Sequence, residues 1–447
     1  MTSTQSPRWT HRWTFILAAT GAAVGLGNIW KFPYITGEYG GGAFVLVYLA
    51  CILLIGVPIM IAEAVIGRHG RADPVTSMQF LSEESGQSPR WAWIAAIGVL
   101  CGLFILMFYS VVAGWALEYV VKSFQGDYIG ANASIIEHQF ERLTADTERQ
   151  FMWHTVFALL TGGIVAAGVT RGVGTAVEIL MPVLFLFLLV LLVYSLMTGD
   201  AAAAARFMFS TDFSKLSVDA VLTAMGHAFF TLSLGMGTII AYGSYMPKRS
   251  RIGNSVMVIA LLDTLIALIA GMAIFPLVFG YGLEPGAGPG LLFVTLPITF
   301  AQMPGGLWLG SLFFLLISIA ALSSSISMIE PGVSWLARKG LGRVGATAAM
   351  TITAWLGGIL CLNSAEAFQF FDDLTAKYML PGGGLLIAIF TGWYANQEIL
   401  KSELAFRNPG WFELWQFVLR YIAPAGVILV FLNSLGLLAI IRQFVGL

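Results

Sequence analysis

Residues 21–44 read GAAVGLGNIWKFPYITGEYGGGAF, and this stretch of the 447-residue chain determines the fold that we expect. It lies in an apolar run long enough to cross a lipid bilayer, yet glycines occupy positions 21, 25 and 27. A glycine in a helix interior costs about 1 kcal/mol relative to alanine. The cluster therefore predicts a helix that is interrupted at membrane depth, where an irregular backbone is tolerated only if it is buried or lines a cavity.

A second interrupted run lies five predicted helices further on, at residues 229–237, FFTLSLGMG. Paired interruptions at matching positions of two halves are typical of transporters built from inverted repeats. In such proteins unwound carbonyls bind cations, and the N-termini of half-helices bind carboxylates. Glycines that serve only close helix packing are the alternative interpretation.

The composition indicates that lipid surrounds most of the chain. Hydrophobic residues make up 58% of it and charged residues 11%, whereas soluble domains have about 25% charged residues. We expect an all-α membrane protein with one transmembrane domain, 1–447, made of a five-helix repeat at 13–198, a second, inverted repeat at 217–396 and an additional helix at 414–441. Apolar runs of about 20 residues predict eleven spans, at 13–36, 42–67, 91–121, 152–169, 177–198, 217–243, 254–281, 306–336, 344–362, 375–396 and 414–441.

Basic residues predict the orientation. They are concentrated in every second connection, which places the N-terminus in the cytoplasm and the C-terminus outside a bacterial cytoplasmic membrane. The long connections 122–151, 199–216 and 282–305 then lie on the outer side, and the apolar stretch 291–300 predicts a short re-entrant helix or lid. A net charge of −1 disfavours a nucleic-acid partner, and three scattered cysteines provide no disulfide framework or metal site.

The stretch 21–44 matches the first-helix signature of the neurotransmitter:sodium symporter family, of the LeuT type, almost residue for residue. Residues 229–237, and ALSSSIS at 321–327, match further motifs, so the chain resembles this family over nearly its whole length. The resemblance implies the LeuT fold, a 5+5 inverted repeat in which helices 1 and 6 are discontinuous. It also implies a secondary transporter rather than an enzyme, one that carries an amino acid with sodium by alternating access.

By this resemblance the substrate lies between the two breaks. The N–H groups of Leu26 and Gly27 and the hydroxyl of Tyr109 would bind the α-carboxylate. The α-ammonium would contact four carbonyl oxygens, those of Ala23, Phe230, Thr231 and Ser233. The side-chain pocket would be lined by Ala22, Ile105, Tyr109, Phe230, Ser233, Met236, Ser324 and Met328.

Two positions set the expected substrate class. Monoamine carriers of this family have an aspartate where this chain has Gly25, so a glycine leaves room for a substrate that brings its own carboxylate. Met236 stands where leucine-type carriers have phenylalanine, and a flexible methionine suits a pocket that accepts several shapes. We therefore expect hydrophobic or aromatic L-amino acids. Ordinary filling of the core is the alternative role for Met236.

The resemblance also implies two Na+ sites with oxygen ligands, which suit a hard cation. Serines that bond the carbonyls of their own helix are the alternative for the second site. The first site would use the carbonyl of Ala23, the side chains of Asn28, Thr231 and Asp263, and the substrate carboxylate, which would couple ion to substrate. The second would use the carbonyls of Gly21, Val24 and Ala320 and the hydroxyls of Ser323 and Ser324.

Asp263 is the most informative single residue, because it lies inside the apolar run IALLDTLIALIA. A carboxylate at mid-membrane costs about 2.5–3.5 kcal/mol on insertion scales and is a functional candidate by default. Chloride-dependent relatives use a bound chloride to balance two sodium charges, so a fixed aspartate predicts transport without chloride. A neutral, hydrogen-bonded Asp263 is one alternative. Another is a proton-coupled carrier in which Asp263, His227 and Glu63 relay protons.

The outer gate is expected around Lys31, which takes the place of an arginine, with Asp372 or Asp373 as its acidic partner. Lysine cannot form the bidentate hydrogen bonds that arginine forms with a carboxylate, so we expect a weaker ion pair. Glu63 matches a helix-two glutamate that supports the unwound backbone of helices 1 and 6. His227 replaces a glutamine near the chloride region, and we expect a hydrogen-bonded interior histidine there.

At the inner gate Trp9 and Tyr245 match the family. The usual inner arginine–aspartate pair does not carry over, because Ser6 and Arg338 occupy its positions, and Arg8 is the candidate substitute.

Other function classes find little support. The five histidines form no HExxH or other metal pair, and no repeated pore loops suggest a channel filter. No obligate protein partner is evident, so the expected partners are the amino acid and the lipid bilayer. A sensor that binds amino acids without transporting them would have the same sequence features.

Overall fold

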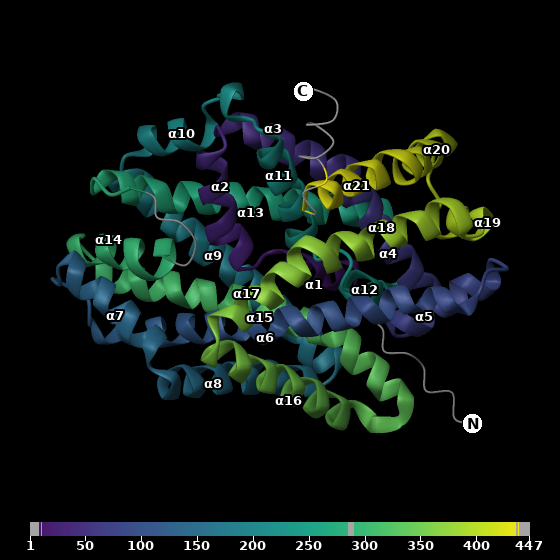
Figure 1. Cartoon of the computed structure of the whole chain (residues 1–447), viewed down its shortest axis with the longest axis horizontal. Coiled ribbons are helices and arrows are strands. Elements are labelled where there is room, and N and C mark those ends of the chain that lie inside the picture. Colours follow the sequence, from purple (N-terminus) through teal and green to yellow (C-terminus); the bar gives the residue numbers. More distant parts are fainter. Residues whose placement is uncertain (1–8, 10, 285–289, 435–436, 438–447) are drawn as a thin grey trace.

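The computed structural model describes residues 9, 11–284, 290–434 and 437, and these residues are almost entirely helical. Figure 1 shows the helices as an elongated bundle. The α-helices are α1 (Arg12–Ala23), α2 (Phe32–Glu38), α3 (Gly42–Cys51), α4 (Val57–Gly70), α5 (Pro74–Glu84), α6 (Ala92–Gln125), α7 (Ala133–Ala145), α8 (Thr147–Ala166), α9 (Thr175–Thr198), α10 (Ala201–Phe209), α11 (Val218–Thr231), α12 (Thr238–Tyr245), α13 (Ile252–Gly280), α14 (Leu296–Gln302), α15 (Gly306–Leu336), α16 (Gly342–Asn363), α17 (Ala365–Asp373), α18 (Leu380–Ile389), α19 (Gln397–Leu404), α20 (Pro409–Phe417) and α21 (Ala423–Ser434).

Within the described part of the chain, seven helical runs are long and apolar enough to cross a membrane, and the bent pair Arg12–Ala23 with Gly27–Glu38 makes an eighth. The run Gly306–Asn363 turns sharply at Gly340 (φ 106°), so α15 and α16 are two helices, not one. With these counted separately, and with α8 and the broken pair α11–α12 added, helices occupy all eleven predicted positions. The all-α membrane class is thereby confirmed, whereas part of the last predicted span, 435–436 and 438–441, lies outside the described residues.

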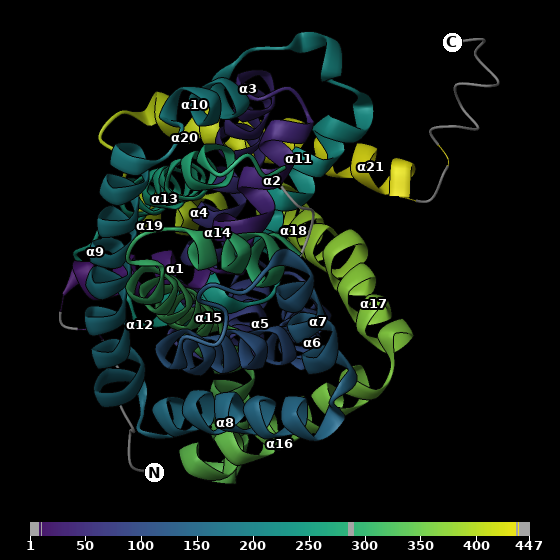
Figure 2. The same ribbon diagram turned by 90° about the vertical axis from the view of Figure 1, so that its left-hand side faces the viewer.

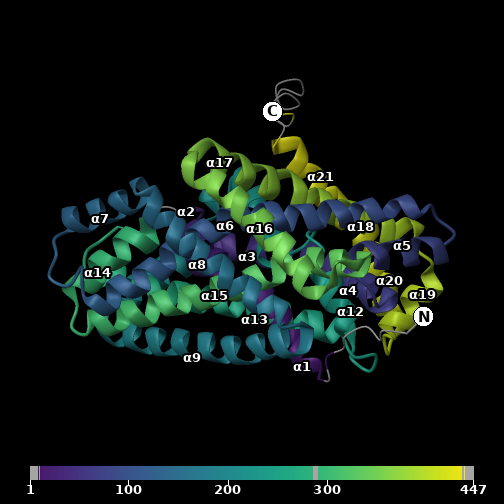
Figure 3. The same cartoon turned by 90° about the horizontal axis from the view of Figure 1, so that it is seen from below.

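The connections gather at the two ends of the bundle. Figures 1 and 3 place α7 and α14, which belong to predicted outer connections, at the left end, and α5 and α19, from predicted cytoplasmic connections, at the right end. The stretch 291–300 forms a helical turn that runs into α14 and packs on α15, as expected for a short helix there. This separation agrees with alternating connections, while the side that each end faces stays a prediction.

The centre of the bundle is its most tightly enclosed part. Seen along the bundle in Figure 2, α1, α6, α13 and α15 lie inside, and α9, α17 and the adjacent pair α8 and α16 lie around them. In the best membrane-spanning window of Pro89–Gln125, 83% of the residues are buried, against 28% for Val169–Thr198. The outer helices therefore present apolar side chains to the surroundings, which in a membrane protein is lipid.

The predicted break in the first helix is present. α1 ends at Ala23, Val24 is extended (φ −78°, ψ 100°), and the helix resumes at Gly27 with a bend of 58°. The side-chain oxygen of Asn28 accepts a hydrogen bond from the N–H of Gly25 at 3.2 Å. Asn28 thus satisfies one of the backbone donors that the break leaves without a helical partner.

The second predicted break separates α11 from α12. Positive φ angles at Ser233 (54°), Gly235 (77°) and Gly237 (78°) turn the chain out of helical geometry. Glycine tolerates this conformation without steric cost. At Gly235 a side chain is also excluded, because a Cβ atom would collide with the carbonyl of Leu380. Both glycine clusters therefore do what the sequence predicted, since they leave irregular backbone inside a closely packed bundle.

Candidate functional site

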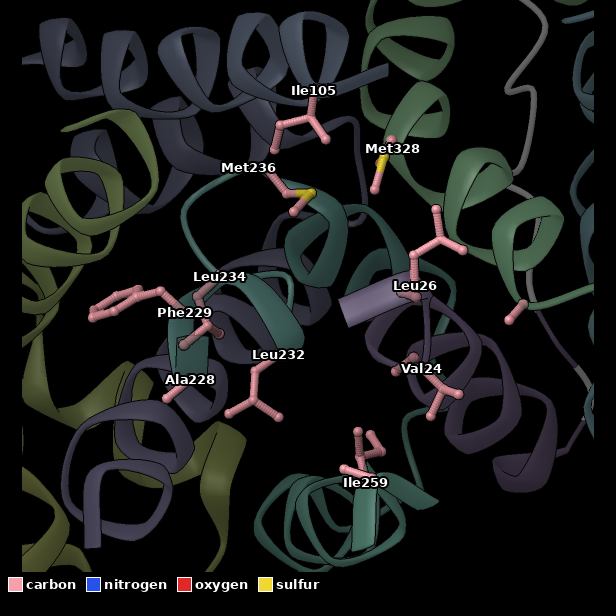
Figure 4. Close-up of a cluster of buried hydrophobic side chains, with 14 of the residues drawn as sticks. Val24, Leu26, Ile105, Ala228, Phe229, Leu232, Leu234, Met236, Ile259 and Met328 are labelled. Atoms are coloured by element: carbon pink, nitrogen blue, oxygen red, sulfur yellow. The ribbon is translucent and has the colours of Figure 1, made fainter. Parts of the chain in front are cut away.

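The residues predicted to surround a substrate side chain come together beside the two breaks. Figure 4 shows Ile105 from α6, Met236 from the second break and Met328 from α15 close to one another above Leu26. All four side chains are buried. The sequence could pair these residues only through the family resemblance, because they come from four separate segments.

The expected carboxylate end is formed by the first break and α6. The N–H of Leu26 points to the hydroxyl of Tyr109 at 3.5 Å, a long contact that leaves both groups able to bind a stronger acceptor or donor. Next to them, a Cβ added at Gly25 would lie 2.7 Å from Ser324 Oγ and 3.1 Å from Tyr109 Oη. Polar groups thus surround the non-helical backbone at this point, and there is no room for a side chain at position 25.

The expected ammonium end is formed by the second break. The hydroxyl of Ser233 donates to the carbonyl of Ala22 at 2.9 Å, and the N–H of Ser233 donates to the carbonyl of Phe230 at 3.1 Å. The first bond connects the end of α1 directly to the second break, and the second bond lies within the second break. Ala23 and Thr231 are the last residues of α1 and α11, so their carbonyls lie at the ends of helices, where orphan acceptors occur.

Asp263 is buried at the centre of the expected first sodium site. Its Oδ1 accepts hydrogen bonds from Asn28 Nδ2 at 2.7 Å and from the Thr231 hydroxyl at 2.8 Å, and its Oδ2 accepts one from Tyr48 at 3.3 Å. None of the ion pairs found among the described residues involves Asp263. Three of the predicted ligands therefore meet at one carboxylate, whose neighbours are polar but uncharged. Tyr48 was missed, because a tyrosine in an apolar span carries no signal of this role.

The second expected sodium site lies between α1 and α15. Ser324 Oγ is 3.3 Å from the carbonyl oxygens of both Gly21 and Val24. The hydroxyl of Ser323 instead donates to the carbonyl of Ala320 in its own helix, at 2.9 Å. The five oxygens predicted to bind the second Na+ ion thus lie in one region. Ser323, however, bonds a carbonyl of its own helix, as expected if this serine is not a sodium ligand.

Glu63 supports the second break, as the resemblance implied. The Gly235 N–H donates to Glu63 Oε1 at 2.8 Å, and Glu63 is fully buried on α4. The hydrogen bonds found in the described chain include none from Glu63 to the first break.

The expected outer-gate residues are near one another without a closed ion pair. Lys31 Nζ lies 6.0 Å from the centre of the Phe230 ring, and Lys31 interacts electrostatically with Asp372. Asp373 instead pairs with Lys377 at 2.7 Å, one helical turn away. In this conformation the described ion pairs do not join Lys31 to either aspartate.

At the opposite end, Trp9 packs against the rings of Tyr245 and Tyr242, and its indole donates to the carbonyl of Val169 at 3.3 Å. The Tyr245 hydroxyl donates to Glu330 at 2.7 Å. The inner-gate assignments of Trp9 and Tyr245 thus fall on residues that touch each other.

Glu330 was missed by the sequence reasoning, although it is a carboxylate in an apolar run, the same signal that marked Asp263. It accepts two bonds from the guanidinium of Arg343, at 2.8 and 2.6 Å. Arg338 forms a separate pair with Asp73 at 3.3 Å. Ser6 and Arg8 lie outside the described residues.

His227 corrects one expectation. Its ring stacks on that of Phe32 and packs against that of Tyr48, with 5.6 Å between the ring centroids in each case. Within the described residues, neither ring nitrogen of His227 has a hydrogen-bond partner. The expectation of a hydrogen-bonded histidine was wrong, because the neighbouring elements offer aromatic faces instead of acceptors.

Known proteins are similar to this chain in sequence and in fold. The sequence model of the sodium:neurotransmitter symporter family matches residues 6–137 and 144–442. The chain belongs to this family. An uncharacterised sodium-dependent transporter of Bacillus subtilis, YhdH, is 35% identical over 98% of this chain and 100% of its own length. A sodium- and chloride-dependent taurine transporter of Bos taurus is 25% identical over 89% of this chain and 72% of its own.

Among solved structures, MhsT in complex with L-phenylalanine aligns with a TM-score of 0.88 at 41% identity, covering 96% of this chain and 99% of that one. The LeuT fold expected from the sequence is thus confirmed. This symporter-family protein is a multi-pass membrane transporter of a sodium-dependent kind, and not an enzyme.

Proposed function

We propose that this transporter carries hydrophobic or aromatic L-amino acids together with sodium, by alternating access and without a requirement for chloride. The observation that carries the proposal is the enclosure of Gly25 by Ser324 and Tyr109, next to the N–H of Leu26. This corner can accept a carboxylate from the substrate, whereas it cannot hold an aspartate that would replace one. A zwitterionic amino acid satisfies both the N–H donors here and the carbonyl acceptors of the second break.

The side chain of the substrate would lie among Ile105, Met236 and Met328. These residues are apolar and buried, and methionine adapts to different shapes. MhsT, which is 41% identical, was solved with L-phenylalanine, and this supports an aromatic substrate here.

Two Na+ ions are proposed as co-substrates. Ala23, Asn28, Thr231 and Asp263 would hold one, and Gly21, Val24, Ala320, Ser323 and Ser324 the other. The uncompensated carboxylate of Asp263 would balance the charge for which chloride is bound in chloride-dependent carriers. Each Na+ ion that crosses a membrane potential of 100 mV releases about 2.3 kcal/mol, and a tenfold sodium concentration gradient adds about 1.4 kcal/mol. Two ions could therefore supply roughly 7 kcal/mol. That energy corresponds to about 10⁵-fold accumulation of a zwitterion.

Proton coupling is the second candidate. The Tyr48 hydroxyl donates to Asp263 and its ring packs against His227, so two ionisable side chains, Asp263 and His227, lie close together in the buried interior. A proton relay between them would need a further hydrogen-bonded group, because neither ring nitrogen of His227 has a partner within the described residues. The convergence of Ser324 with two backbone carbonyls favours sodium, because such neutral oxygens bind a cation and have no proton to exchange at neutral pH.

For the membrane location we propose the bacterial cytoplasmic membrane, with the N-terminus in the cytoplasm and the C-terminus outside. The lysine and arginine bias of alternate connections supports this orientation.

The test is uptake of radiolabelled leucine, tryptophan and glycine by the purified protein in liposomes, in sodium or choline medium at constant pH and chloride. We expect sodium-dependent uptake of leucine and tryptophan and little of glycine. Replacement of chloride by gluconate should leave the uptake unchanged. Equal uptake in choline would remove sodium coupling and favour protons.

A further inference from the structure

An apolar groove of about 590 Å³ opens on the side of the bundle, between the α4 region, α13 and α20. Its walls include Leu54, Met257, Leu414 and Trp411, whose exposed fractions are 44%, 47%, 51% and 61%. Two arginines, Arg251 and Arg407, lie at the same groove. The groove thus combines an apolar floor with positive charge.

A second cavity of about 510 Å³ adjoins the groove, because Arg251 and Asn254 line both. It is strongly basic, since Arg12, Lys248 and Arg249 line it as well. None of the described residues that line the groove or this basic cavity carries a carboxylate. The charge of the arginines is therefore not neutralised from within the site.

The start of α13 adds to the positive potential. Arg251 occupies the N-cap position without a side-chain cap, and the first turn has no acidic residue. The free N–H groups and the helix dipole at such an end attract phosphate. Arg12 is held at this point, because its Nε donates to Ser255 Oγ at 3.0 Å.

We infer that the groove and the basic cavity together bind one anionic phospholipid. Its acyl chains would lie along the apolar groove, and its phosphate would contact Arg12, Arg251 and Arg407. Figures 1 and 3 place α4, α19 and α20 toward the end of the bundle that carries the predicted cytoplasmic connections. Anionic lipids are concentrated in that leaflet, and basic pockets between helices there are suited to their headgroups. Trp411 suits the same boundary, because tryptophan is enriched at membrane interfaces.

One consequence rests on the proposed function. A phosphate that contacts Arg12 and Arg251 would join α1 to the start of α13. We expect the inner side to open by movement of α1, the half-helix on the inner side of the first break. A lipid that joins α1 to α13 would then hold the inner side closed. A cysteine introduced by Ser244→Cys, next to the inner-gate Tyr245, should then react more slowly with a thiol reagent in anionic than in zwitterionic lipid.

The binding itself is tested on the full chain without substrate or sodium. Retention of phosphatidylglycerol and of phosphatidylcholine would be compared by native mass spectrometry, and the thermal stability gained from each lipid would be recorded. The double variant Arg251→Gln/Arg407→Gln should bind phosphatidylglycerol roughly 25-fold more weakly, because each arginine contributes a factor of about five. Arg171→Gln is the matched control, since Arg171 is exposed, lies in a predicted cytoplasmic connection and lines neither cavity.

A second variant tests the groove without changing charge. Met257→Trp should fill the groove and weaken phosphatidylglycerol binding, even if the arginine variant fails to fold. Equal binding of the two lipids by the parent protein, or unchanged binding by both variants, would overturn the inference. Equal stabilisation by inorganic phosphate alone would show that the ligand is a free anion rather than a lipid. If the lipid binds but sodium-driven uptake is absent, the proposed function fails and the site stands.

Discussion

The amide of Asn28 donates a hydrogen bond of 2.7 Å to the carboxylate of Asp263, across 235 positions of sequence. This bond joins the break of the first helix to the middle of α13. Because the same asparagine also accepts from the N–H of Gly25, one side chain connects the backbone of the expected substrate corner to the expected sodium site. If both proposed sites are correct, Asn28 would link the bound sodium ion to the bound substrate directly.

The charge of Asp263 is expected to replace chloride. Asp263→Asn retains the shape and part of the hydrogen bonding, but it removes the negative charge. We expect uptake in chloride-free medium to fall more than tenfold, and chloride to restore part of it. The measurement is sodium-driven uptake in chloride and gluconate media, with the exposed Asp219→Asn as control. Chloride-independent uptake by the Asp263 variant would contradict the charge argument.

Gly25 is expected to exclude any side chain. Gly25→Asp places a Cβ atom against Ser324 Oγ and Tyr109 Oη and adds a carboxylate in the position of the substrate's own. Binding of leucine should weaken at least 100-fold, measured by equilibrium binding in sodium. Gly226→Ala is the control, because no atom lies within 4 Å of a Cβ there and alanine favours the helix. Comparable losses in both variants would mean that helix packing in general was disturbed.

Ser324 is expected to be a sodium ligand. Ser324→Ala removes the hydroxyl that meets the carbonyls of Gly21 and Val24, at a cost of about 1.4 kcal/mol. The sodium concentration for half-maximal uptake should rise roughly tenfold. Ser318→Ala, on the same helix, removes a hydroxyl that bonds its own helix and should leave sodium dependence unchanged. If both variants need the same sodium as the parent, the second site is wrongly assigned.

Met236 is expected to set the breadth of the pocket. Met236→Phe puts a rigid ring beside Ile105 and Met328, so large substrates lose room first. The ratio of tryptophan to leucine uptake should fall roughly tenfold, since about 1–3 kcal/mol of overpacking bears mainly on the larger substrate. Met152→Phe, at a 48% exposed position on α8, should leave the ratio unchanged. An unchanged ratio in the Met236 variant would assign that residue to core filling.

Glu330 and Arg343 are expected to stabilise the inner end. Glu330→Gln removes the carboxylate that forms a bidentate ion pair with Arg343, and it should lower the free energy of unfolding by about 2 kcal/mol. This is less than the 3–5 kcal/mol of a fully buried pair, because the Arg343 side chain is 22% exposed. Thermal unfolding in detergent measures the loss, with the exposed Glu366→Gln as control. Recovery of stability by Glu330→Met combined with Arg343→Met would support the unpaired charge as the cause.

Local chemistry explains what could be predicted from the sequence. Long apolar runs give the membrane class, since backbone polar groups in lipid are satisfied only within helices. Clustered glycines gave both breaks at their observed positions, around Gly25 and Gly235. A lone carboxylate in lipid is costly wherever the chain goes, so Asp263 was recognisable as a candidate functional residue, and its role stays a prediction.

The tertiary structure alone decided which groups meet. Tyr48 donates to Asp263, and His227 lies against rings without a hydrogen-bond partner in the described chain, although neither residue differs in pattern from ordinary core residues. Ser324 meets Gly21 from 303 positions away. Sequence periodicity fixes where a helix lies and which of its faces is apolar, but it carries no information on which distant backbone carbonyl a hydroxyl will face. That pairing depends on how the helices pack, because hydrogen bonds act over about 3 Å and the packing of the whole bundle sets positions at that scale.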